Sequence, residues 1–361
     1  MKPVYIGATS QDSGKTSVSL GLMQVLRDQK LDPGYMKPVG QHYVKYEGHN
    51  IDEDAVLVHK VFDIKDNPAC LSPIAIERGF TKHFIFDPDV KPLEDKIVTC
   101  YEELNNKHSM VIVEGTGHAG VGSCFGLSNA KVAQLLGAKV IIVTSGGIGK
   151  PIDEVALNLS LFKKFDVDVA GVILNKVMPD KIEMVRMTVK QGLKNLGARL
   201  IGVIPYDRDL TFFTMGQLVE EFNYQVLCGD DKLLNRIENT IIAAMEPKHA
   251  LKYIAKSSLV IVSSDRINNI KVAIDVLSSY PEHERGGLIL TGSMEMTDEL
   301  KCLIDGCPVP VLCSPADTFR VSSQMASLEF KIRSFDTEKI SKLHTLTNEN
   351  VDISYILNKL E

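Results

Sequence analysis

A short stretch near the N-terminus has the residue types and spacing to bind phosphate. Gly14-Lys15-Thr16 follows a small polar loop and opens a helical pattern. In a P-loop, backbone N–H groups and the helix N-terminus surround the phosphates, the lysine reaches the β- and γ-phosphates, and the hydroxyl binds Mg²⁺. We therefore predict a P-loop in which Lys15 and Thr16 have these roles. The usual first glycine, five positions before Gly14, is Thr9 here.

Carboxylates at other strand ends could complete a cation site. Glu114 directly follows the apolar run 110–113, and a carboxylate at the tip of a neighbouring parallel strand can hold or orient Mg²⁺. Asp52 and Asp54 begin a helix, where an aspartate is ordinarily the N-cap. We assign Asp54 to the metal and leave Asp52 as an N-cap or a second ligand. The predicted metal ligands are Thr16, Asp54 and Glu114.

Lysine and amide side chains follow further strands. Lys37 ends a short apolar run and could neutralise a phosphate or a substrate carboxylate, or be a solvated strand-end lysine. Asn175 could pair with an adenine edge or cap a turn, and Pro205 ends the next strand and could line the base. The catalytic candidates are Lys15 and Lys37. The residues predicted to contact ATP are Thr9, Asp12, Ser13, Gly14, Lys15, Thr16, Ser17, Asn175 and Pro205.

Strand and helix patterns alternate along residues 1–210, the predicted ATP-binding domain. Five apolar strands with intervening helices predict an α/β fold: a parallel, doubly wound sheet of the P-loop NTPase type with helices on both faces. Functional loops of such a sheet lie at the carboxyl ends of its strands. Residues 32–34 are predicted to form a turn. Residues 66–92, which contain four prolines, are predicted to be rich in loops.

The sequence pattern changes near residue 211, and we predict a second, smaller α/β domain over residues 211–325. Strand and helix patterns alternate there again, including a predicted helix over residues 249–254. Residues 326–361 are predicted to be a C-terminal tail that is partly helical.

Composition and charge narrow the classes of function. The 361 residues carry a formal net charge of −6 and are 44% hydrophobic, as in ordinary globular proteins. A negative net charge of this size does not create the positive electrostatic potential that would attract nucleic acid or anionic lipid. No 18-residue apolar run or signal-peptide pattern occurs, and seven cysteines without C-x-x-C spacing predict reduced thiols. We expect a cytoplasmic protein that binds neither nucleic acid nor membrane.

The first domain resembles the dethiobiotin synthetases and the related cobyrinic acid a,c-diamide synthases. The matching segments are Gly7 to Thr16, Lys37-Pro38-Val39, the aspartate near Asp54, Val113-Glu114-Gly115, Gly171 to Asn175 and Gly202 to Pro205. Members of these families use MgATP to phosphorylate a carboxylate or a carbamate. The resemblance implies that MgATP is bound by Lys15, Thr16, Asp54 and Glu114. It also implies that Lys37 contacts the transferring phosphate or the acceptor and that Asn175 reads adenine.

The motif after Glu114 departs from the pattern of these families. Dethiobiotin synthetases usually continue it as Glu-Gly-Ala-Gly-Gly, whereas this chain has Glu114-Gly115-Thr116-Gly117-His118. His118 could be a general base or an unconstrained loop residue. The diaminopelargonate-binding residues cannot be mapped, and no Cys/His pair of a glutaminase domain is found. The signature lysine of MinD-type proteins would fall at Ser10, so their trans-lysine dimer mechanism is not supported.

Two segments of the second domain, Ser264-Asp265-Arg266 and Leu290-Thr291-Gly292-Ser293, resemble the DRTGG domain, which is named for such residues. Each follows a predicted strand, where backbone N–H groups and Arg266 could bind an anion; the alternative is a structural Asp–Arg pair. The candidate ligand residues are Asp265, Arg266, Thr291 and Gly292.

The order of the two domains resembles the N-terminal region of long phosphate acetyltransferases, over roughly residues 1–325. No acetyltransferase domain follows in the 361 residues, so we do not expect acetyl transfer by this chain alone.

Two functions are consistent with these features. The first is a nucleotide-dependent regulator or sensor that binds ATP and Mg²⁺, forms a homo-oligomer and acts on a partner such as a separate phosphate acetyltransferase. The second is an ATP-dependent ligase that activates a small carboxylate or carbamate. The complete set of phosphate and metal residues favours retained nucleotide chemistry, whereas the lack of a recognisable acceptor pocket favours the sensor. We take the sensor as the leading hypothesis.

Overall fold

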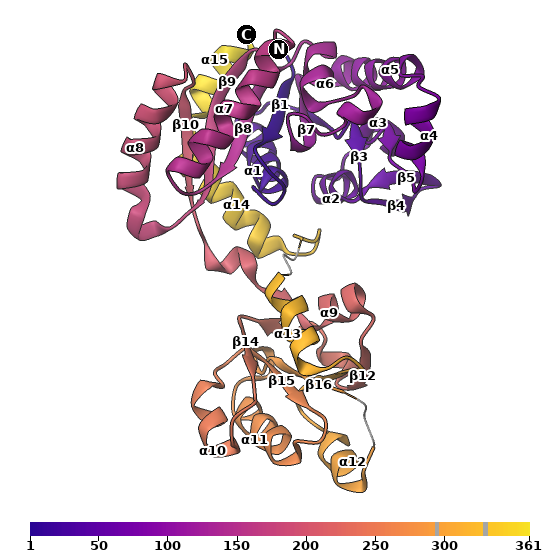
Figure 1. Ribbon diagram of the computed structural model, residues 1–361, viewed down its shortest axis with the longest axis vertical. Coiled ribbons are helices and arrows are strands. Elements are labelled where there is room, and N and C mark those ends of the chain that lie inside the picture. The colour runs from indigo at the N-terminus through magenta and orange to yellow at the C-terminus, as the bar shows by residue number, and fades with distance from the viewer. Residues whose placement is uncertain (293–295, 328–330) are drawn as a thin grey trace. The chain divides into compact units, whose positions relative to one another are not determined.

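The computed structural model describes residues 1–292, 296–327 and 331–361. It divides into two compact units (Figure 1). The first contains Met1–Asp207 and Ile332–Glu361, and the second contains Arg208–Lys331. The chain therefore leaves the first unit after Asp207 and returns to it at Ile332. Ser293, part of the DRTGG-like segment, lies outside the described residues.

A six-stranded parallel sheet in the order β10-β9-β8-β1-β7-β2 forms the centre of the first unit. Its strands are β1 Val4–Ala8, β2 Pro33–Met36, β7 Met110–His118, β8 Lys139–Ser145, β9 Val169–Val177 and β10 Leu200–Pro205. All residues of β1 are buried, because both faces of the sheet are covered by helices. Strands are added on one side of β1 and then on the other, which makes the sheet doubly wound. The predicted fold class is confirmed.

The edge strand β2 corrects two predictions. The sheet has six strands rather than five, and Pro33 and Gly34, which were predicted to form a turn, are the first residues of β2. A proline cannot donate to a strand ladder, but among the described residues β2 pairs with β7 alone and lies at the edge of the sheet. The edge position therefore accommodates residues that would disfavour a central strand.

Helices lie on both faces of this sheet, and a small insertion separates β2 from α5 (Figure 1). The helices are α1 Lys15–Asp28, α5 Lys91–Lys107, α6 Asn129–Leu135, α7 Gly149–Lys164, α8 Ile182–Asn195, α14 Thr337–Asn350 and α15 Ile353–Leu360. The insertion contains β3 Val39–Gly40, β4 Tyr43–Tyr46, β5 His49–Asp52, α2 Glu53–Val61, α3 Pro68–Leu71, β6 Ile74–Ala75 and α4 Phe80–Phe86. Residues 66–92 are therefore less irregular than predicted, since Pro68 occupies the first turn of α3, where proline is favoured.

The C-terminal helix α14 packs directly on α1, the helix that follows the P-loop. A Cβ atom on Gly21 of α1 would lie 2.0 Å from Oγ1 of Thr347 and 2.9 Å from the backbone oxygen of Leu343. His344 of α14 lies 2.7 Å from the carboxylate of Asp28 at the end of α1. The absence of a side chain at position 21 is thus what allows the two helices to approach so closely.

The substitution Gly21→Ala is expected to lower the free energy of unfolding by about 1–3 kcal/mol through overpacking against α14. The clash involves the backbone oxygen of Leu343, which cannot rotate away. Gly149→Ala is the matched control, because no atom lies within 4 Å of its Cβ position. A helical Gly→Ala change without a clash stabilises by up to about 1 kcal/mol. Urea denaturation measures both variants, and equal midpoints for Gly21→Ala and the wild type would contradict the close packing.

The second unit is built on a five-stranded sheet in the order β12-β17-β16-β15-β14. Its strands are β12 Gln225–Cys228, β14 Asn239–Ile242, β15 Ser258–Ser263, β16 Gly287–Thr291 and β17 Val311–Ser314, and only β12 runs antiparallel. The remaining elements are α9 Met215–Phe222, α10 Pro247–Ala250, α11 Ile267–Ser278, α12 Asp298–Ile304, α13 Thr318–Ser327 and the strand pair β11 Phe213–Thr214 with β13 Arg236–Ile237. The predicted helix over 249–254 was wrong in extent, since α10 ends at Ala250 and a 3₁₀ turn follows.

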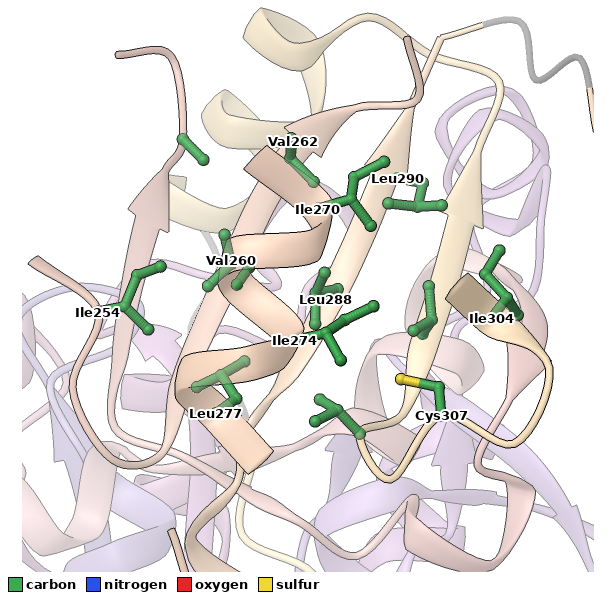
Figure 2. Close-up of a cluster of buried hydrophobic side chains, with 14 of the residues drawn as sticks. Ile254, Val260, Val262, Ile270, Ile274, Leu277, Leu288, Leu290, Ile304 and Cys307 are labelled. Atoms are coloured by element: carbon green, nitrogen blue, oxygen red, sulfur yellow. The ribbon is translucent and has the colours of Figure 1, made fainter. Parts of the chain in front are cut away.

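Each face of this second sheet carries its own hydrophobic core. Along β15, Val260 and Val262 pack on one side beneath Ile270 and Ile274 of α11 (Figure 2). Leu259 and Ile261 of the same strand belong to the core on the opposite side. Successive strand residues point to opposite faces, so a continuous apolar run builds both cores.

All seven cysteines are free thiols, and four of them are buried. Among the described residues, no helix is long and apolar enough to cross a membrane.

Candidate functional site

The P-loop connects the carboxyl end of β1 to the first turn of α1. Gly14 has a φ of +87°, a conformation that favours glycine. Its missing side chain also makes room for β9, because a Cβ atom there would lie 2.1 Å from Nδ2 of Asn175. The predicted contact residues along this stretch are Thr9, Asp12, Ser13, Gly14, Lys15, Thr16 and Ser17.

Asn175, near the end of β9, forms a hydrogen bond with the backbone of the P-loop. Its Nδ2 donates a buried hydrogen bond of 3.0 Å to the backbone oxygen of Ser13, and its Oδ1 accepts from the N–H of Lys176 at 2.9 Å. In this structure both polar ends of the amide are bonded to backbone, as in the turn-capping alternative. Pro205 lies at the end of the adjacent strand β10, where Tyr206 donates its N–H to the oxygen of Val177.

Thr9, which replaces the usual glycine, connects the P-loop through hydrogen bonds to the end of β8 and to α7. Its hydroxyl lies 2.9 Å from that of Thr144 at the end of β8 and donates to Oε2 of Glu154 at 2.7 Å. One turn further along α7, Asn158 accepts the N–H of Ala119 at 2.7 Å. Helix α7 therefore contacts both the P-loop and the segment after β7. Sequence reasoning missed Glu154 and Asn158, because nothing in a helix pattern marks such distant contacts.

Glu114 is completely buried beside the first turn of α1. Thr16 donates its hydroxyl to Oε1 of Glu114 at 2.8 Å, and Tyr35 of β2 donates its hydroxyl to Oε2 at 3.0 Å. The parallel register of β1, β7 and β2 brings these three side chains together. Tyr35 was not predicted to be a site residue, since a tyrosine in an apolar strand resembles an ordinary core residue.

Lys37 lies among three carboxylates at the end of β2. Its ammonium contacts Asp54, lies 3.1 Å from Oδ1 of Asp52 and lies 3.6 Å from Oε1 of Glu114. Only 5% of Lys37 is exposed, so the alternative of a solvated strand-end lysine is excluded. Asp52 is also the N-cap of α2, because its side chain accepts the N–H of Asp54 at 3.0 Å.

Burial and charge set the protonation of this cluster. Burial alone would lower the pKa of Lys37, but the carboxylates of Asp54, Glu114 and Asp52 together raise that pKa well above its ordinary value. Burial raises the pKa of Glu114 and of Asp52, whereas Lys37 opposes both shifts. Burial lowers the pKa of Lys15. Lys37 is therefore an ammonium at neutral pH and acts as a cation rather than as a base.

The composition of the cluster fits a divalent cation. Three carboxylates and two lysines leave an excess of negative charge, and the Thr16 hydroxyl and the Glu114 carboxylate are hard oxygen ligands of the kind that Mg²⁺ prefers. Among the described residues, however, no group of three His, Cys, Asp or Glu side chains that could hold a metal ion occurs. The assignment of Thr16, Asp54 and Glu114 to Mg²⁺ stays a prediction.

The strand β7 continues beyond Glu114 through His118, so His118 ends a strand rather than lying in an unconstrained loop. Asn129 holds this extension: its Nδ2 donates to the oxygens of Thr116 and His118 at 2.7 and 2.6 Å. Tyr5 of β1 donates its hydroxyl to Oδ1 of Asn129 at 2.8 Å. The exposed His118 accepts the N–H of Gly120 on its Nδ1 at 3.2 Å.

The candidate residues of the second unit lie at the carboxyl ends of neighbouring strands. Asp265 and Arg266 follow β15 and are exposed, while Thr291 ends β16 and is buried. Ser264 donates its N–H to the oxygen of Thr291 at 3.0 Å, and Gly292 has a φ of +89°. No ion pair between Asp265 and Arg266 occurs among the described residues, so the structural Asp–Arg pair is not observed.

Comparisons with known proteins agree with this architecture. A family model described as AAA domain, AAA_26, matches residues 2–214, and the model of the DRTGG domain matches residues 217–328. The phosphate acetyltransferase of Nitratidesulfovibrio vulgaris is 27% identical over 374 residues, which cover 99% of this chain and 51% of that protein. The ATP-dependent dethiobiotin synthetase BioD of Anoxybacillus flavithermus is 29% identical over 223 residues, which cover 61% of this chain and 97% of that protein.

Among solved structures, the MinC:MinD cell division protein complex of Aquifex aeolicus is similar, with a TM-score of 0.38 and 16% identity over 58% of this chain and 84% of that one. The chain spans about half the length of the phosphate acetyltransferases that it matches. The predicted relationship to phosphate acetyltransferases and dethiobiotin synthetases is confirmed, and the P-loop fold supports nucleotide binding. This chain belongs to the AAA_26 family of AAA domains and carries a DRTGG domain after its P-loop domain.

Proposed function

We propose that this protein binds MgATP at its P-loop and acts as a nucleotide-dependent regulator or sensor. The observation that carries the proposal is the convergence of Lys15, Thr16, Lys37 and Glu114 at the carboxyl ends of adjacent parallel strands. Preorganised cations and dipoles of this kind stabilise phosphate groups most strongly where water is excluded. The DRTGG domain supplies the response to a second ligand or the contacts of a homo-oligomer.

Each residue of the site has a defined task in this proposal. The backbone N–H groups of the P-loop and the ammonium of Lys15 bind the phosphates. Thr16, Asp54 and Glu114 hold Mg²⁺, which neutralises phosphate charge when bound. Lys37 remains protonated and attracts the terminal phosphate. Asn175 keeps the loop in shape through its hydrogen bond to Ser13.

The similarity to phosphate acetyltransferases suggests the partner. The alignment with the phosphate acetyltransferase of Nitratidesulfovibrio vulgaris includes 99% of this chain, and therefore both domains. We propose that a separate phosphate acetyltransferase is the protein that this chain regulates. Copurification of such an enzyme from the native source tests this part directly.

A second candidate function is an ATP-dependent ligase that activates a small carboxylate or carbamate. An alignment over 61% of this chain covers 97% of a dethiobiotin synthetase. In addition, Lys37 could contact an acceptor beside the phosphate that is transferred. The alignment, together with the position of Lys37 beside the P-loop carboxylates, supports the ligase as the alternative.

The substitution Lys15→Ala is expected to weaken MgATP binding by about 10- to 100-fold, since hydrogen bonds to charged groups are worth about 1.5–3 kcal/mol. Isothermal titration of the full chain measures the change. Lys163→Ala, at an exposed position near the end of α7, is the control and should bind like the wild type. Absence of MgATP binding by the wild-type protein would refute both candidate functions.

Turnover assays then separate the two candidates. The wild-type chain is mixed with MgATP and a panel of small carboxylic acids and amines, and ADP release is followed. Release that depends on one acceptor, and that Lys15→Ala abolishes, would establish the ligase. MgATP binding without acceptor-dependent release would support the sensor.

A further inference from the structure

A cavity of about 690 Å³ lies in the first unit beside the edge strand β10, and the P-loop residues do not line it. Its walls come from α8, from the loop that leads into β10, and from the junction of α14 with α15. Figure 1 shows α8 and β10 as neighbours at this side of the sheet. The volume falls within the range of about 300–1,000 Å³ that is typical of small-molecule sites.

One wall of the cavity is cationic. Arg186, Lys190 and Lys194 recur every four residues on α8 and therefore share one face of that helix. Arg199 adds a fourth positive charge, whereas only Glu349 and Asp352 contribute carboxylates. The lining thus has a positive balance although the whole chain has a formal net charge of −6. A concave surface of one sign concentrates ions of the opposite sign.

Two of these four cations are free to meet a ligand. Arg199 is held by Asp352 at 3.8 Å and lies over the ring of Tyr355 at 3.9 Å. Arg186 lies 3.7 Å from Glu183 on its own helix. Lys190 and Lys194 have no ion-pair partner among the described residues. Two lysines four residues apart on a helix can both donate hydrogen bonds to one doubly charged group.

The floor of the cavity is apolar and fixed in place. Leu200 and Val351 line it beside the cationic wall. Val351 pairs with Gly202 as an antiparallel bridge, and Asp352 donates its N–H to the oxygen of Ile201 at 2.8 Å. The C-terminal segment therefore closes the edge of the sheet and preforms the cavity. Cations on one side and hydrocarbon on the other suit a ligand with one anionic group on a carbon skeleton.

We propose that this cavity binds a small organic phosphate, with the phosphate between Lys190 and Lys194 and the carbon skeleton against Leu200 and Val351. A phosphate monoester carries close to two negative charges at neutral pH, which matches the two free lysines. The carboxylates of Glu349 and Asp352 on the opposite wall disfavour a long acidic chain. The site goes beyond the proposed nucleotide function and does not depend on it.

Phenyl phosphate is the probe, and the full-length Lys15→Ala protein is the background that suppresses binding at the P-loop. Isothermal titration is expected to show binding that becomes at least about tenfold weaker in Lys190→Ala/Lys194→Ala, because two charge-assisted contacts are lost. The control is Lys163→Ala/Lys164→Ala at the end of α7, which removes two exposed lysines outside the cavity. The four lysines are all exposed, so folding should be unaffected, and circular dichroism verifies this.

Several outcomes would overturn the proposal. They are a lack of phenyl phosphate binding at millimolar concentration, equal affinities of the cavity variant and the control variant, and an affinity for inorganic phosphate as high as that for phenyl phosphate. Equal affinity for inorganic phosphate and phenyl phosphate would show that the apolar floor does not contribute to binding. Because the background already lacks the P-loop lysine, failure here leaves the MgATP proposal untouched, and failure of MgATP binding leaves this site untouched.

Discussion

Replacing Lys37 with methionine is expected to lower the free energy of unfolding at pH 7 by about 3–5 kcal/mol, as for the loss of one partner from a buried ion pair. The methionine fills a similar volume but leaves Asp52, Asp54 and Glu114 without the cation between them. Urea denaturation measures the change. Lys139→Met is the matched control: Lys139 pairs with an exposed Asp168 at 2.6 Å, and a surface pair is worth about 0–1 kcal/mol.

The pH dependence of the Lys37→Met variant follows from the raised pKa of the carboxylates. In the folded wild type, burial already raises the pKa of Glu114 above 4.5 and that of Asp52 above 3.8. Removal of Lys37 eliminates the charge that opposes these shifts. A folded state with raised carboxyl pKa values binds protons that the unfolded chain has released, so stability is lost as pH rises from about 4 through the folded pKa values. The deficit of the variant should therefore shrink as the pH falls from 7 towards 5.

A divalent cation should partly replace the missing charge. We expect Mg²⁺ to raise the denaturation midpoint of Lys37→Met more than that of the wild type, since the variant retains all three carboxylates. A variant that is as stable as the wild type at pH 7, in the presence of EDTA, would show that the three carboxylates do not depend on Lys37.

The substitution Gly14→Ala is expected to abolish tight MgATP binding, with a loss of affinity of at least about 100-fold, which corresponds to about 2.7 kcal/mol. Two causes act together. The added Cβ atom would lie 2.1 Å from Nδ2 of Asn175, and the φ of +87° disfavours any residue with a Cβ atom. The loop must therefore change shape where its N–H groups should face phosphate. Equilibrium binding of labelled ATP measures the effect.

Two companion variants separate the causes in Gly14→Ala. Gly137 has a φ of +60° and no atom within 4 Å of its Cβ position, so Gly137→Ala has the strain without the clash. It should lose about 1 kcal/mol of stability and bind MgATP normally. Adding Asn175→Ala to Gly14→Ala removes the clash and should recover part of the affinity, as a double-mutant cycle shows. Normal binding by Gly14→Ala alone would contradict the proposed role of the loop.

The parallel sheet explains why much of the candidate site could be predicted. Glu114, Lys37 and Asn175 each follow an apolar run, and the carboxyl ends of parallel strands meet at one edge. The structure places Glu114 beside Thr16 and Asn175 behind Ser13. Strand periodicity and a P-loop are local signals, so they can be recognised in a sequence without knowing the strand order.

Partners that depend on strand order or helix orientation could not be predicted. Tyr35 reaches Glu114 only because β2 lies next to β7. Glu154 reaches Thr9 only because α7 packs on β8, the strand next to β1. Asp52 was considered mainly as an N-cap, yet it is both the cap of α2 and a partner of Lys37. Side chains of this kind resemble ordinary core or surface residues until the sheet is assembled.

The sequence by itself predicted the P-loop, the α/β class and the strand-end residues, because these follow from short-range patterns of polarity and glycine. The family of each domain was indicated by resemblance to known families, and the family models agree. Only the tertiary structure decided that the C-terminal helices return to the first unit, where α14 packs against Gly21 and Val351 closes the edge at β10. An amphipathic helix pattern shows that one face must be buried but does not identify the surface that buries it. That choice depends on contacts between residues about 150–330 positions apart, which no local pattern encodes.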